Sequence, residues 1–468
     1  MSVMSAVDRP AKKGGLEIDT ARILGRSTAH FGVIDIGSNS IRLVVYDSLG
    51  RAPFPRFNEK TFPELGDRMD ETGHLTADAI ARAVQAVRRL DAIARAMQVS
   101  RVDILATEAV RRASNGAALI TAITRATGRE ARVLTGAEEA SYTALGVIAG
   151  FSAPKGLVGD IGGGSLEVAE VLGDRVGARK SSMPLGALVV RALMAEGGDR
   201  AKKTIDAELA ENLPPLLTEP VLYAVGGGWR ALARIHIAMS DAPITVTHGY
   251  ALDADTARAL AKKIARMTPE EVAALPDVPG RRIATLPAAA LVMSRVLKHL
   301  RPARVVFSAY GLREGWLFGQ LDAEEQRRDP LLEGAQIIGL PRARVPEFSA
   351  ALAAWTEDLF PAETATDRRL RLSVCALTDM AWRDHEKVRA RECFHRLLQF
   401  PFIGITHPER AFLATAVMAR YGGKIDERVR ARVAPLIGDA GLRRAEILGR
   451  ALRLGHRFSA SVPAILAE

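Results

Sequence analysis

A short pattern that occurs twice constrains the fold of this chain more than any other feature of its sequence. In Phe31–Asp47 a strand-forming apolar run ends at Asp35, a turn of four small residues follows, and a second apolar run returns, which is the pattern of a β-hairpin. The same order recurs in Gly156–Val171, where Asp160 ends the first run. When the copies are superposed, the residues that coincide are Asp35, Ile36, Gly37 and Ser40 with Asp160, Ile161, Gly162 and Ser165. The repeat predicts two similar lobes, each of which directs one turn at a shared cleft.

The residue types at the two tips predict phosphate binding. Backbone N–H groups of a glycine turn can surround an anion without obstruction from side chains. A carboxylate beside such a turn suits a hard divalent cation, usually Mg²⁺. A third glycine turn, Gly226–Gly228, follows a further predicted strand at Val221–Val225. One such turn is common in hairpins, whereas two in matching positions and a third nearby predict a phosphate site with Mg²⁺ or another divalent cation as its cofactor.

The order of predicted strands and helices divides the 468 residues into four segments. Residues 1–28 begin polar and basic and are expected to form a flexible leader. Strands and helices alternate in residues 29–150 and again in residues 151–320, so each of these segments is predicted to form one α/β lobe. In residues 321–468 strand-forming runs vanish and Arg-rich helical periodicity continues. The expected fold is therefore α/β, with two lobes followed by an all-α C-terminal domain.

The composition narrows the class of partner. A net charge of +10 at pH 7 favours a polyanion or an anionic surface. No run approaches the roughly 20 apolar residues of a membrane span, and no signal-peptide pattern is found, so no membrane association is expected. The two cysteines, Cys375 and Cys393, predict buried thiols in a reducing cytoplasm. Aromatic residues make up only 5% of the chain, which disfavours stacking of single strands, so no nucleic-acid partner is expected.

Arginines recur along the predicted helices of the C-terminal domain. Charged residues on helices are usually solvated, and this is one interpretation. The other is a basic channel that guides a long polyanion to the cleft, because few acidic residues lie nearby in the sequence. The arginines considered are Arg368, Arg369, Arg371, Arg383, Arg389, Arg391, Arg428, Arg430, Arg432, Arg443 and Arg444.

Several motifs, in this order, resemble those of one protein family. The main ones are Asp35–Arg42 (DIGSNSIR), Gly136–Ala140 (GAEEA), Asp160–Glu167 (DIGGGSLE) and Val225–Gly228 (VGGG), with Ala106–Asn115 (ATEAVRRASN) and Gly311–Gly315 (GLREG) in support. They make the chain similar to the exopolyphosphatase / guanosine pentaphosphate phosphohydrolase family, within the superfamily of actin, sugar kinases and chaperone ATPases. The resemblance implies actin-like (ribonuclease H-like) lobes, hydrolysis of a terminal phosphoanhydride by water, and a homodimer. It also implies lobe closure, with hinges near Ala149–Ser152 and Gly315–Gln320.

The resemblance further implies roles for individual residues. Catalytic roles are implied for Glu139, which matches the family's general base, and for its neighbour Glu138, which ranks below it as a neighbour or helix-cap group. Without the motif, both acids would be interpreted as groups that favour a helix N-terminus. Arg112 makes the assignment of Arg111 ambiguous, and Gly226–Gly228 also fit a plain turn. Metal ligation or contact with the attacking water is implied for Asp160, Glu167 and Asp35. Phosphate binding is implied for Gly37, Ser38, Asn39, Ser40, Arg42, Arg111, Gly162, Gly163, Gly164, Ser165 and Gly227.

The sequence departs from the family pattern in two places. Arg282-Ile283-Ala284 lacks the acid of the family's Arg-Ala-Asp segment. In the helical domain many relatives carry a His-Asp pair, which here is Asp384-His385 in reversed order. Together with His395 and His407 this pair has no metal-ligand spacing, so no second metal site is expected and His407 is predicted to be a packing or helix-start residue.

The expected activity is processive release of terminal orthophosphate from inorganic polyphosphate. Hydrolysis of guanosine pentaphosphate is the nearest alternative, with guanosine tetraphosphate as a related ligand, because the same loops and base serve both. The long basic C-terminal extension favours the chain-like substrate. A sugar or acid kinase is disfavoured by the Glu-Glu-Ala motif. A non-catalytic polyphosphate or alarmone sensor is disfavoured because Glu139, Asp160 and Glu167 are intact.

Overall fold

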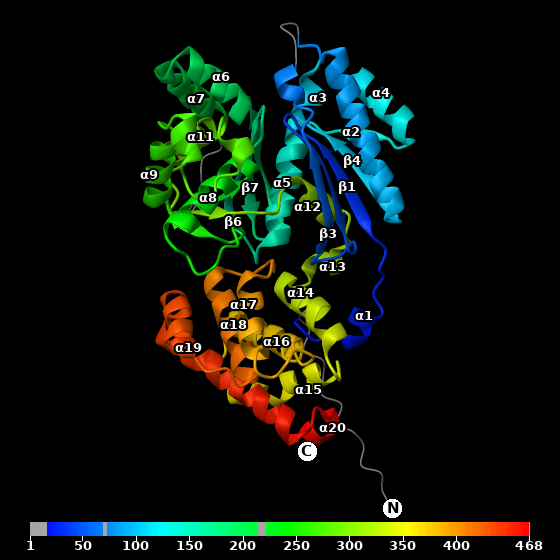
Figure 1. Cartoon of the computed structure of the whole chain (residues 1–468), viewed down its shortest axis with the longest axis vertical. Helices are drawn as coiled ribbons and strands as arrows, with labels where there is room; N and C mark the ends of the chain where they lie inside the picture. Colours follow the sequence, from blue (N-terminus) through cyan, green and yellow to red (C-terminus); the bar gives the residue numbers. More distant parts are fainter. Residues whose placement is uncertain (1–15, 69–72, 214–220, 468) are drawn as a thin grey trace, which may run out of the picture.

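The computed structural model describes residues 16–68, 73–213 and 221–467 of the chain. Two α/β lobes lie side by side, and a helical domain lies below both of them (Figure 1). This arrangement confirms the fold class that the repeated hairpin and the change of pattern near residue 321 predict.

The first lobe is built on a five-stranded sheet with the order β3-β2-β1-β4-β5. Strands β1 and β2 pair in antiparallel fashion and set Asp35 opposite Arg42, so the first predicted hairpin is confirmed. Apolar side chains of this sheet and of two long helices form one core. The strands are β1 (Phe31–Ile36), β2 (Ile41–Tyr46), β3 (Pro55–Thr61), β4 (Arg101–Ala106) and β5 (Ala131–Val133), and the helices are η1 (Leu65–Arg68), α2 (Ala77–Ala96), α3 (Glu108–Arg112) and α4 (Gly116–Thr127).

The second lobe repeats this plan and adds one strand. Its sheet has the order β10-β11-β9-β6-β7-β8, in which β6 and β7 form the second predicted hairpin and set Asp160 opposite Glu167. The strands are β6 (Lys155–Ile161), β7 (Leu166–Leu172), β8 (Arg175–Met183), β9 (Val221–Val225), β10 (Ala251–Asp253) and β11 (Arg304–Phe307). The helices are α6 (Ala187–Glu196), α7 (Gly198–Asn212), α8 (Gly227–Met239), α9 (Ala254–Ile264), α10 (Pro269–Ala273), η2 (Gly280–Arg282) and α11 (Leu286–Leu300).

Two helices, α5 (Gly136–Gly150) and α12 (Leu312–Phe318), cross between the sheets (Figure 1). Helix α5 buries its apolar side against the sheet of the second lobe, whereas α12 packs on the sheet of the first. The packing therefore differs from the predicted boundaries at residues 150 and 320, because each helix covers the sheet of the other segment. A side chain at Gly146 would overlap Gly311, and one at Gly315 would overlap the Tyr142 carbonyl. The absence of a side chain at Gly146 and at Gly315 thus permits the close crossing.

The C-terminal domain consists of helices packed around a core of its own. No strand follows Phe307 among the residues that the structure describes. Helix α19 is kinked at Gly438, whose φ of 63° is not helical. The helices are α13 (Ala323–Arg327), α14 (Pro330–Gly339), η3 (Leu340–Arg342), α15 (Phe348–Trp355), η4 (Glu357–Leu359), α16 (Ala365–Leu377), α17 (Arg389–Gln399), α18 (His407–Arg420), α19 (Glu427–Phe458) and α20 (Pro463–Ala467).

The N-terminal segment is more ordered than expected. Residues 1–15 of the predicted leader lie outside the described residues, but α1 (Thr20–Leu24) is helical and lies beside α14 (Figure 1). Its Ile23 is buried among apolar residues of the C-terminal domain, and Arg22 pairs with Glu333. Burial and a salt bridge to a distant element thus order this part of the leader, which the local sequence does not predict.

All three parts of the molecule meet at the C-terminal end of α5, where one hinge is predicted. The Ala149 carbonyl accepts a hydrogen bond from Arg51 of the first lobe. The Gly150 carbonyl lies 2.9 Å from the His248 ring nitrogen of the second lobe and accepts a hydrogen bond from the Gly404 N–H of the C-terminal domain. Lobe closure about this point stays a prediction. None of the described helices combines the length and the apolar character that a membrane crossing requires.

Candidate active site

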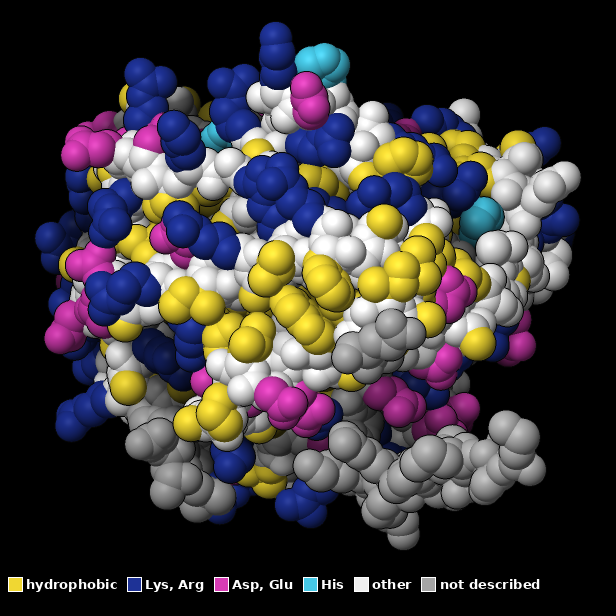
Figure 2. Space-filling model, turned by 90° about the horizontal axis from the view of Figure 1, so that it is seen from below, with side chains coloured by type: hydrophobic (Ala, Val, Ile, Leu, Met, Phe, Trp, Pro, Cys, Tyr) yellow, Lys and Arg dark blue, Asp and Glu magenta, His cyan; other side chains and the backbone are white. Residues whose placement is uncertain are grey.

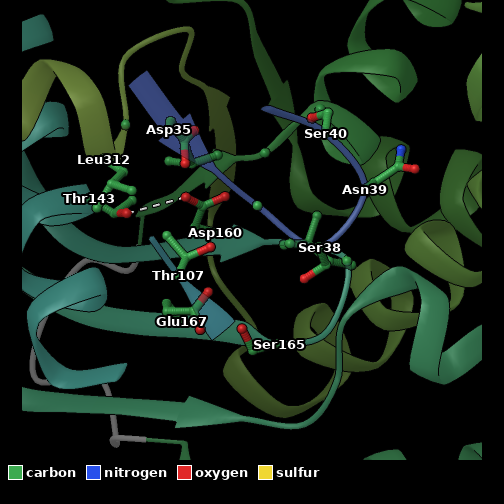
Figure 3. Close-up of a pocket in the computed structure, with 18 of the residues that line it drawn as sticks. Asp35, Ser38, Asn39, Ser40, Thr107, Thr143, Asp160, Ser165, Glu167 and Leu312 are labelled. Atoms are coloured by element: carbon green, nitrogen blue, oxygen red, sulfur yellow. Dashed lines mark hydrogen bonds between the residues drawn. The ribbon is translucent and has the colours of Figure 1, made fainter. Parts of the chain in front are cut away.

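The two hairpin turns face one cavity of about 200 Å³ between the lobes (Figure 3). Most of the residues singled out in the sequence line it. They are Asp35, Gly37, Ser38, Asn39, Ser40, Arg42, Glu139, Asp160, Gly162, Gly163, Ser165, Glu167 and Gly227. Glu138, Arg111 and Gly164 are not among the lining residues.

The two turns have the same backbone geometry. The Gly37 N–H donates to the Ser40 carbonyl at 3.0 Å, and the Gly162 N–H donates to the Ser165 carbonyl at 2.9 Å. Each turn therefore presents its small residues toward the cavity from the end of a buried strand. The two tips also approach each other, because a Cβ atom at Gly163 would lie 2.9 Å from the Cβ of Ser38.

Three carboxylates of the hairpins gather behind the turns. Asp35 and Asp160 are the next-to-last residues of β1 and β6, and Glu167 faces Asp160 across the second hairpin (Figure 3). The Thr143 hydroxyl donates to Asp160 at 3.2 Å, and the Ser182 hydroxyl donates to Glu167 at 2.9 Å. Burial raises the pKa of Asp35 and of Asp160. It raises the pKa of Glu167 further, because the neighbouring Glu139 also disfavours its charged form.

Glu139 reaches the same carboxylate cluster from the first turn of α5. Glu139 is buried, with only 5% of its surface exposed. Its carboxylate accepts a hydrogen bond from Arg111 at 2.9 Å, and Arg111 also donates to the Leu134 carbonyl at 2.5 Å. Burial raises the pKa of Glu139 to about 7, although Arg111 favours the charged form. A carboxylate with this pKa can hold or release a proton near neutral pH.

Glu138 lies beside Glu139 in the sequence but serves the helix end. The Glu138 carboxylate accepts hydrogen bonds from the backbone N–H and from the hydroxyl of Thr135. The Thr135 hydroxyl oxygen in turn accepts a hydrogen bond from the Glu138 N–H, and the two residues thus form a capping box. Its outer oxygen pairs with Arg132 at 2.5 Å. The helix-cap interpretation therefore accounts for Glu138, whose side chain lies outside the cavity.

A basic wall faces the carboxylates. It is formed by Arg42, Lys60, Arg230, Arg282 and Arg313. Arg313 lies 3.3 Å from Asp35, and Arg230 donates to the Ser308 carbonyl at 3.0 Å. Burial, reinforced by the neighbouring guanidinium groups, lowers the pKa of Lys60 to about 8. Such a concentration of positive charge in a cleft favours an anionic ligand.

The sequence model described as the Ppx/GppA phosphatase family matches residues 29–324, and the model described as "Exopolyphosphatase, C-terminal" matches residues 331–468. The first match alone spans more than half of the chain and contains every residue of the cavity. The chain belongs to the Ppx/GppA phosphatase family.

Proteins from several organisms are similar to different parts of this Ppx/GppA chain. Exopolyphosphatase 1 of Mycobacterium tuberculosis is 31% identical over 309 residues, which are 63% of this chain and 88% of that protein. Retrograde regulation protein 2 of Saccharomyces cerevisiae is 26% identical over 446 residues, which are 85% of this chain and 73% of that protein. Solved structures of the Aquifex aeolicus family member and of an exopolyphosphatase from Cytophaga hutchinsonii both have a TM-score of 0.53 and 25% identity. They cover 62% of this chain and 96% and 98% of their own.

The donor set of this Ppx/GppA cavity suits a divalent cation that is shared with a ligand. Its carboxylate oxygens are hard donors, which Mg²⁺ prefers, and Mg²⁺ commonly binds one or two carboxylates together with waters and substrate phosphates. Among the described residues no three His, Cys, Asp or Glu side chains converge closely enough to hold a metal ion by themselves. Asp160, Glu167 and Asp35 therefore fit an ion that phosphate oxygens help to coordinate, rather than a closed protein cage.

Several cavity residues were not predicted from the sequence. Arg313 and Glu108 stand inside motifs shared with the Ppx/GppA family, GLREG and ATEAVRRASN, but the motifs drew attention to other residues. Glu108 accepts a hydrogen bond from the Ser38 hydroxyl at 3.0 Å. Arg230 lies two residues after the third glycine turn, and this position was a usable signal. Lys60 lies on β3 and carries no local signal, because only sheet pairing with β2 brings it to Arg42.

Proposed function

We propose that this chain is an exopolyphosphatase that removes the terminal orthophosphate of inorganic polyphosphate by attack of water. One observation carries the proposal: a single cavity sets two phosphate-type turns and a basic wall against a cluster of buried carboxylates. A phosphate chain requires the first two features, and its hydrolysis requires the third. The resemblance to the mycobacterial exopolyphosphatase supports the same substrate.

The terminal phosphates would lie between the two turns. Backbone N–H groups at Ser38–Ser40 and at Gly163–Ser165 then supply donors to phosphate oxygens, as glycine turns do in other phosphate sites, whereas the N–H groups of Gly37 and Gly162 close the turns. Arg42, Arg230 and Arg313 line the same cavity, and a guanidinium group can bind a phosphate through two parallel hydrogen bonds. The remainder of the chain would leave the cavity along the basic wall, which favours repeated cleavage before release.

Glu139 is assigned as the general base. A water oxygen forms a bond to the terminal phosphorus, and the water's proton passes to the Glu139 carboxylate. The anhydride bond breaks, and its electron pair stays on the bridging oxygen of the shortened chain. The pKa of Glu139 near 7 suits proton acceptance at neutral pH, and Arg111 holds the carboxylate at 2.9 Å. Arg111 is therefore a positioning residue rather than a phosphate ligand.

Asp160, Glu167 and Asp35 would hold the divalent cation. Such a cation neutralises charge on the phosphates when it is bound. Burial raises the pKa of each of these three carboxyl groups, because it disfavours their charged forms. A bound cation would stabilise the charged forms. Thr143 and Ser182 fix the orientations of Asp160 and Glu167 by hydrogen bonds.

Two adjacent acids provide a matched test. Glu139→Gln and Glu138→Gln remove the same charge one residue apart, but only Glu139 lines the cavity. Phosphate release from long-chain polyphosphate with Mg²⁺ should fall about 10²–10⁴-fold in Glu139→Gln. It should stay within about twofold of the parent in Glu138→Gln, because glutamine preserves the capping box. Equal losses in both variants would overturn the assignment of the base.

The same assay distinguishes the substrates. Guanosine pentaphosphate is compared with polyphosphate at equal concentrations of terminal phosphate. Faster release from polyphosphate supports the proposal, and faster release from the nucleotide replaces it with a guanosine pentaphosphate phosphohydrolase. Tight binding of either compound without release by the parent protein would overturn the enzymatic function in favour of a sensor.

A further inference from the structure

A second cavity, of about 330 Å³, borders the cleft at the tips of the two turns. It lies between α3 of the first lobe and α6 of the second, both labelled in Figure 1. Three residues line this outer cavity as well as the cleft: Ser38, Glu108 and Leu188. Their side chains therefore separate the two spaces, and we call these three residues the partition.

The backbone around the partition is held by hydrogen bonds. The Ser38 carbonyl accepts one from the Gly66 N–H at 2.7 Å, and the Gly163 carbonyl accepts one from the Leu188 N–H at 2.8 Å. A Cβ atom at Gly163 would lie 2.9 Å from the Ser38 Cβ and 3.2 Å from the Leu188 side chain, so the space between these residues is already filled. The two cavities can therefore join only if a side chain of the partition is removed or moves aside.

Glu108 gives the partition a negative charge. Its side chain is 12% exposed, and its carboxylate accepts a hydrogen bond from the Ser38 hydroxyl at 3.0 Å. The same carboxylate lies against Gly164, where an added Cβ atom would overlap it. Arg112 lies 3.3 Å away, but its side chain is half exposed, so solvent screens much of this pairing. An acid thus stands beside two turns whose N–H groups suit an anion, and it repels one.

One short helix, α3, positions both the acid of the partition and the proposed base. Thr107, directly before Glu108, donates two hydrogen bonds to the Ile36 carbonyl at the end of β1, from its N–H at 3.1 Å and from its hydroxyl at 3.2 Å. Arg111, later in the same helix, holds the Glu139 carboxylate at 2.9 Å. Because both acids are tied to α3, the distance between the partition and the base is fixed.

The charge of the partition contrasts with that of other surfaces that a phosphate chain could contact. The basic wall of the cleft attracts phosphates, whereas Glu108 repels them. Figure 2 shows the face of the C-terminal domain, on which Lys and Arg side chains lie dispersed around apolar ones. The partition combines a filled space with a negative charge, and this combination suits the closed end of a channel for a polyanion.

We infer that the partition, and Glu108 in particular, stops a phosphate chain at its terminal phosphate and thereby restricts cleavage to the last anhydride bond. This inference rests on the proposed exopolyphosphatase function. If the partition were open, the chain would extend from the cleft into the outer cavity, and water would attack an internal phosphorus. Glu139 would again take the proton of the water, and the electron pair would stay on the bridging oxygen. The leaving products would then include pyrophosphate and tripolyphosphate. Glu108 is therefore a specificity-determining residue.

The products formed early in the hydrolysis of long-chain polyphosphate test this inference. They are separated by ion chromatography after reaction of the full chain with Mg²⁺. The parent should release orthophosphate. In Glu108→Ala the share of pyrophosphate and tripolyphosphate should rise about tenfold or more, because a like charge and the atoms that fill the space are both lost. Glu108→Gln, which removes the charge but keeps the size, should give a smaller rise. A purely structural role of Glu108 would change the rate but leave the products the same.

Glu196→Ala is the control, because it removes an acid of α6 that lines neither cavity, and its products should match those of the parent. If Glu108→Ala does not fold, Leu188→Ala, which opens the apolar side of the partition, replaces it with the same expectation. Three results would overturn the inference: orthophosphate alone from the folded partition variant, an equal change in Glu196→Ala, or pyrophosphate as an early product of the parent. The proposed function fails separately, when the parent hydrolyses no polyphosphate at all.

Discussion

The two hairpins share a turn but differ in the pair of residues directly behind it. In the first lobe Asp35 faces Arg42, so an acid stands opposite a base. In the second lobe Asp160 faces Glu167, so an acid stands opposite an acid. Arg42 and Glu167 occupy equivalent positions of the two ladders. The repeated backbone therefore places two similar turns face to face, and the residue opposite the shared aspartate is a base in one copy and an acid in the other.

The tips of the turns differ as well. Ser38 and Asn39 of the first turn correspond to Gly163 and Gly164 of the second. A side chain at Gly163 would crowd Ser38, and one at Gly164 would overlap the Glu108 carboxylate. The second turn is richer in glycine because residues of the first lobe lie against it. Its composition therefore reflects contact between the lobes.

Of the changes to the two hairpins, removal of the acid that distinguishes the second one is expected to have the largest effect. Glu167→Gln keeps the shape of the side chain and its contact with Ser182 but abolishes the charge. We expect kcat to fall about 10²–10³-fold, measured as phosphate release with Mg²⁺. Glu170→Gln, on the same strand and outside the cavity, is the control. A loss of less than about twofold in Glu167→Gln would show that the acid–acid pair has no role in the reaction.

A smaller loss is expected when the base of the first hairpin is removed. Arg42→Gln should raise KM for polyphosphate about 10–100-fold, because a charge-assisted contact to phosphate is lost. Arg42→Lys should recover part of this loss, since it keeps the charge without the planar fork. Arg89→Gln, an exposed residue paired with Glu59, is the control. A fall in kcat with unchanged KM would contradict a binding role for Arg42.

The repeated hairpins were predictable because the information lies within one short segment. Asp35, Gly37 and Ser40 recur at the same spacing in the second copy, and an apolar run flanks the turn on either side in both copies. The parts that were not predicted depend on tertiary contact. Strand pairing brings Lys60 to the cavity. Arg313 contacts Asp35 although the two residues are 278 positions apart in the sequence. For the same reason, the sequence did not predict that α5 covers the sheet of the second lobe and α12 the sheet of the first.

The adjacent acids Glu138 and Glu139 have different surroundings that local sequence rules cannot distinguish. Both stand in the first turn of α5, and helix-capping rules apply to each of them equally. Only the direction of the helix relative to the cleft decides that Glu138 completes a capping box while Glu139 is buried beside Arg111. The order of the pair in the motif predicted this division, and the spacing of the residues alone did not.

A more modest effect is expected from closing the space between the two turns. Gly164→Ala places a methyl group where the Glu108 carboxylate lies, so this flexible side chain must move and its hydrogen bond from Ser38 is lost, at a cost of about 1–1.5 kcal/mol. We expect kcat/KM to fall about tenfold, measured with polyphosphate. Glu108→Ala in the same chain should restore part of the loss. Gly198→Ala, which meets no neighbouring atom, is the control, and an equal effect there would contradict the contact argument.

The smallest expected effect is a shift in pH dependence rather than a loss of rate. A general base must be deprotonated, so the activity of the parent should rise with pH through about 7, the pKa of Glu139. Arg111 lowers that pKa by favouring the charged carboxylate. Arg111→Met should therefore move the rise in activity to higher pH while the plateau changes little. Arg132→Met removes the matching arginine from Glu138 and should leave the profile in place. A rise that stays fixed or moves to lower pH in Arg111→Met would mean that another group controls the reaction, and the cluster around Glu167 would then be the place to seek it.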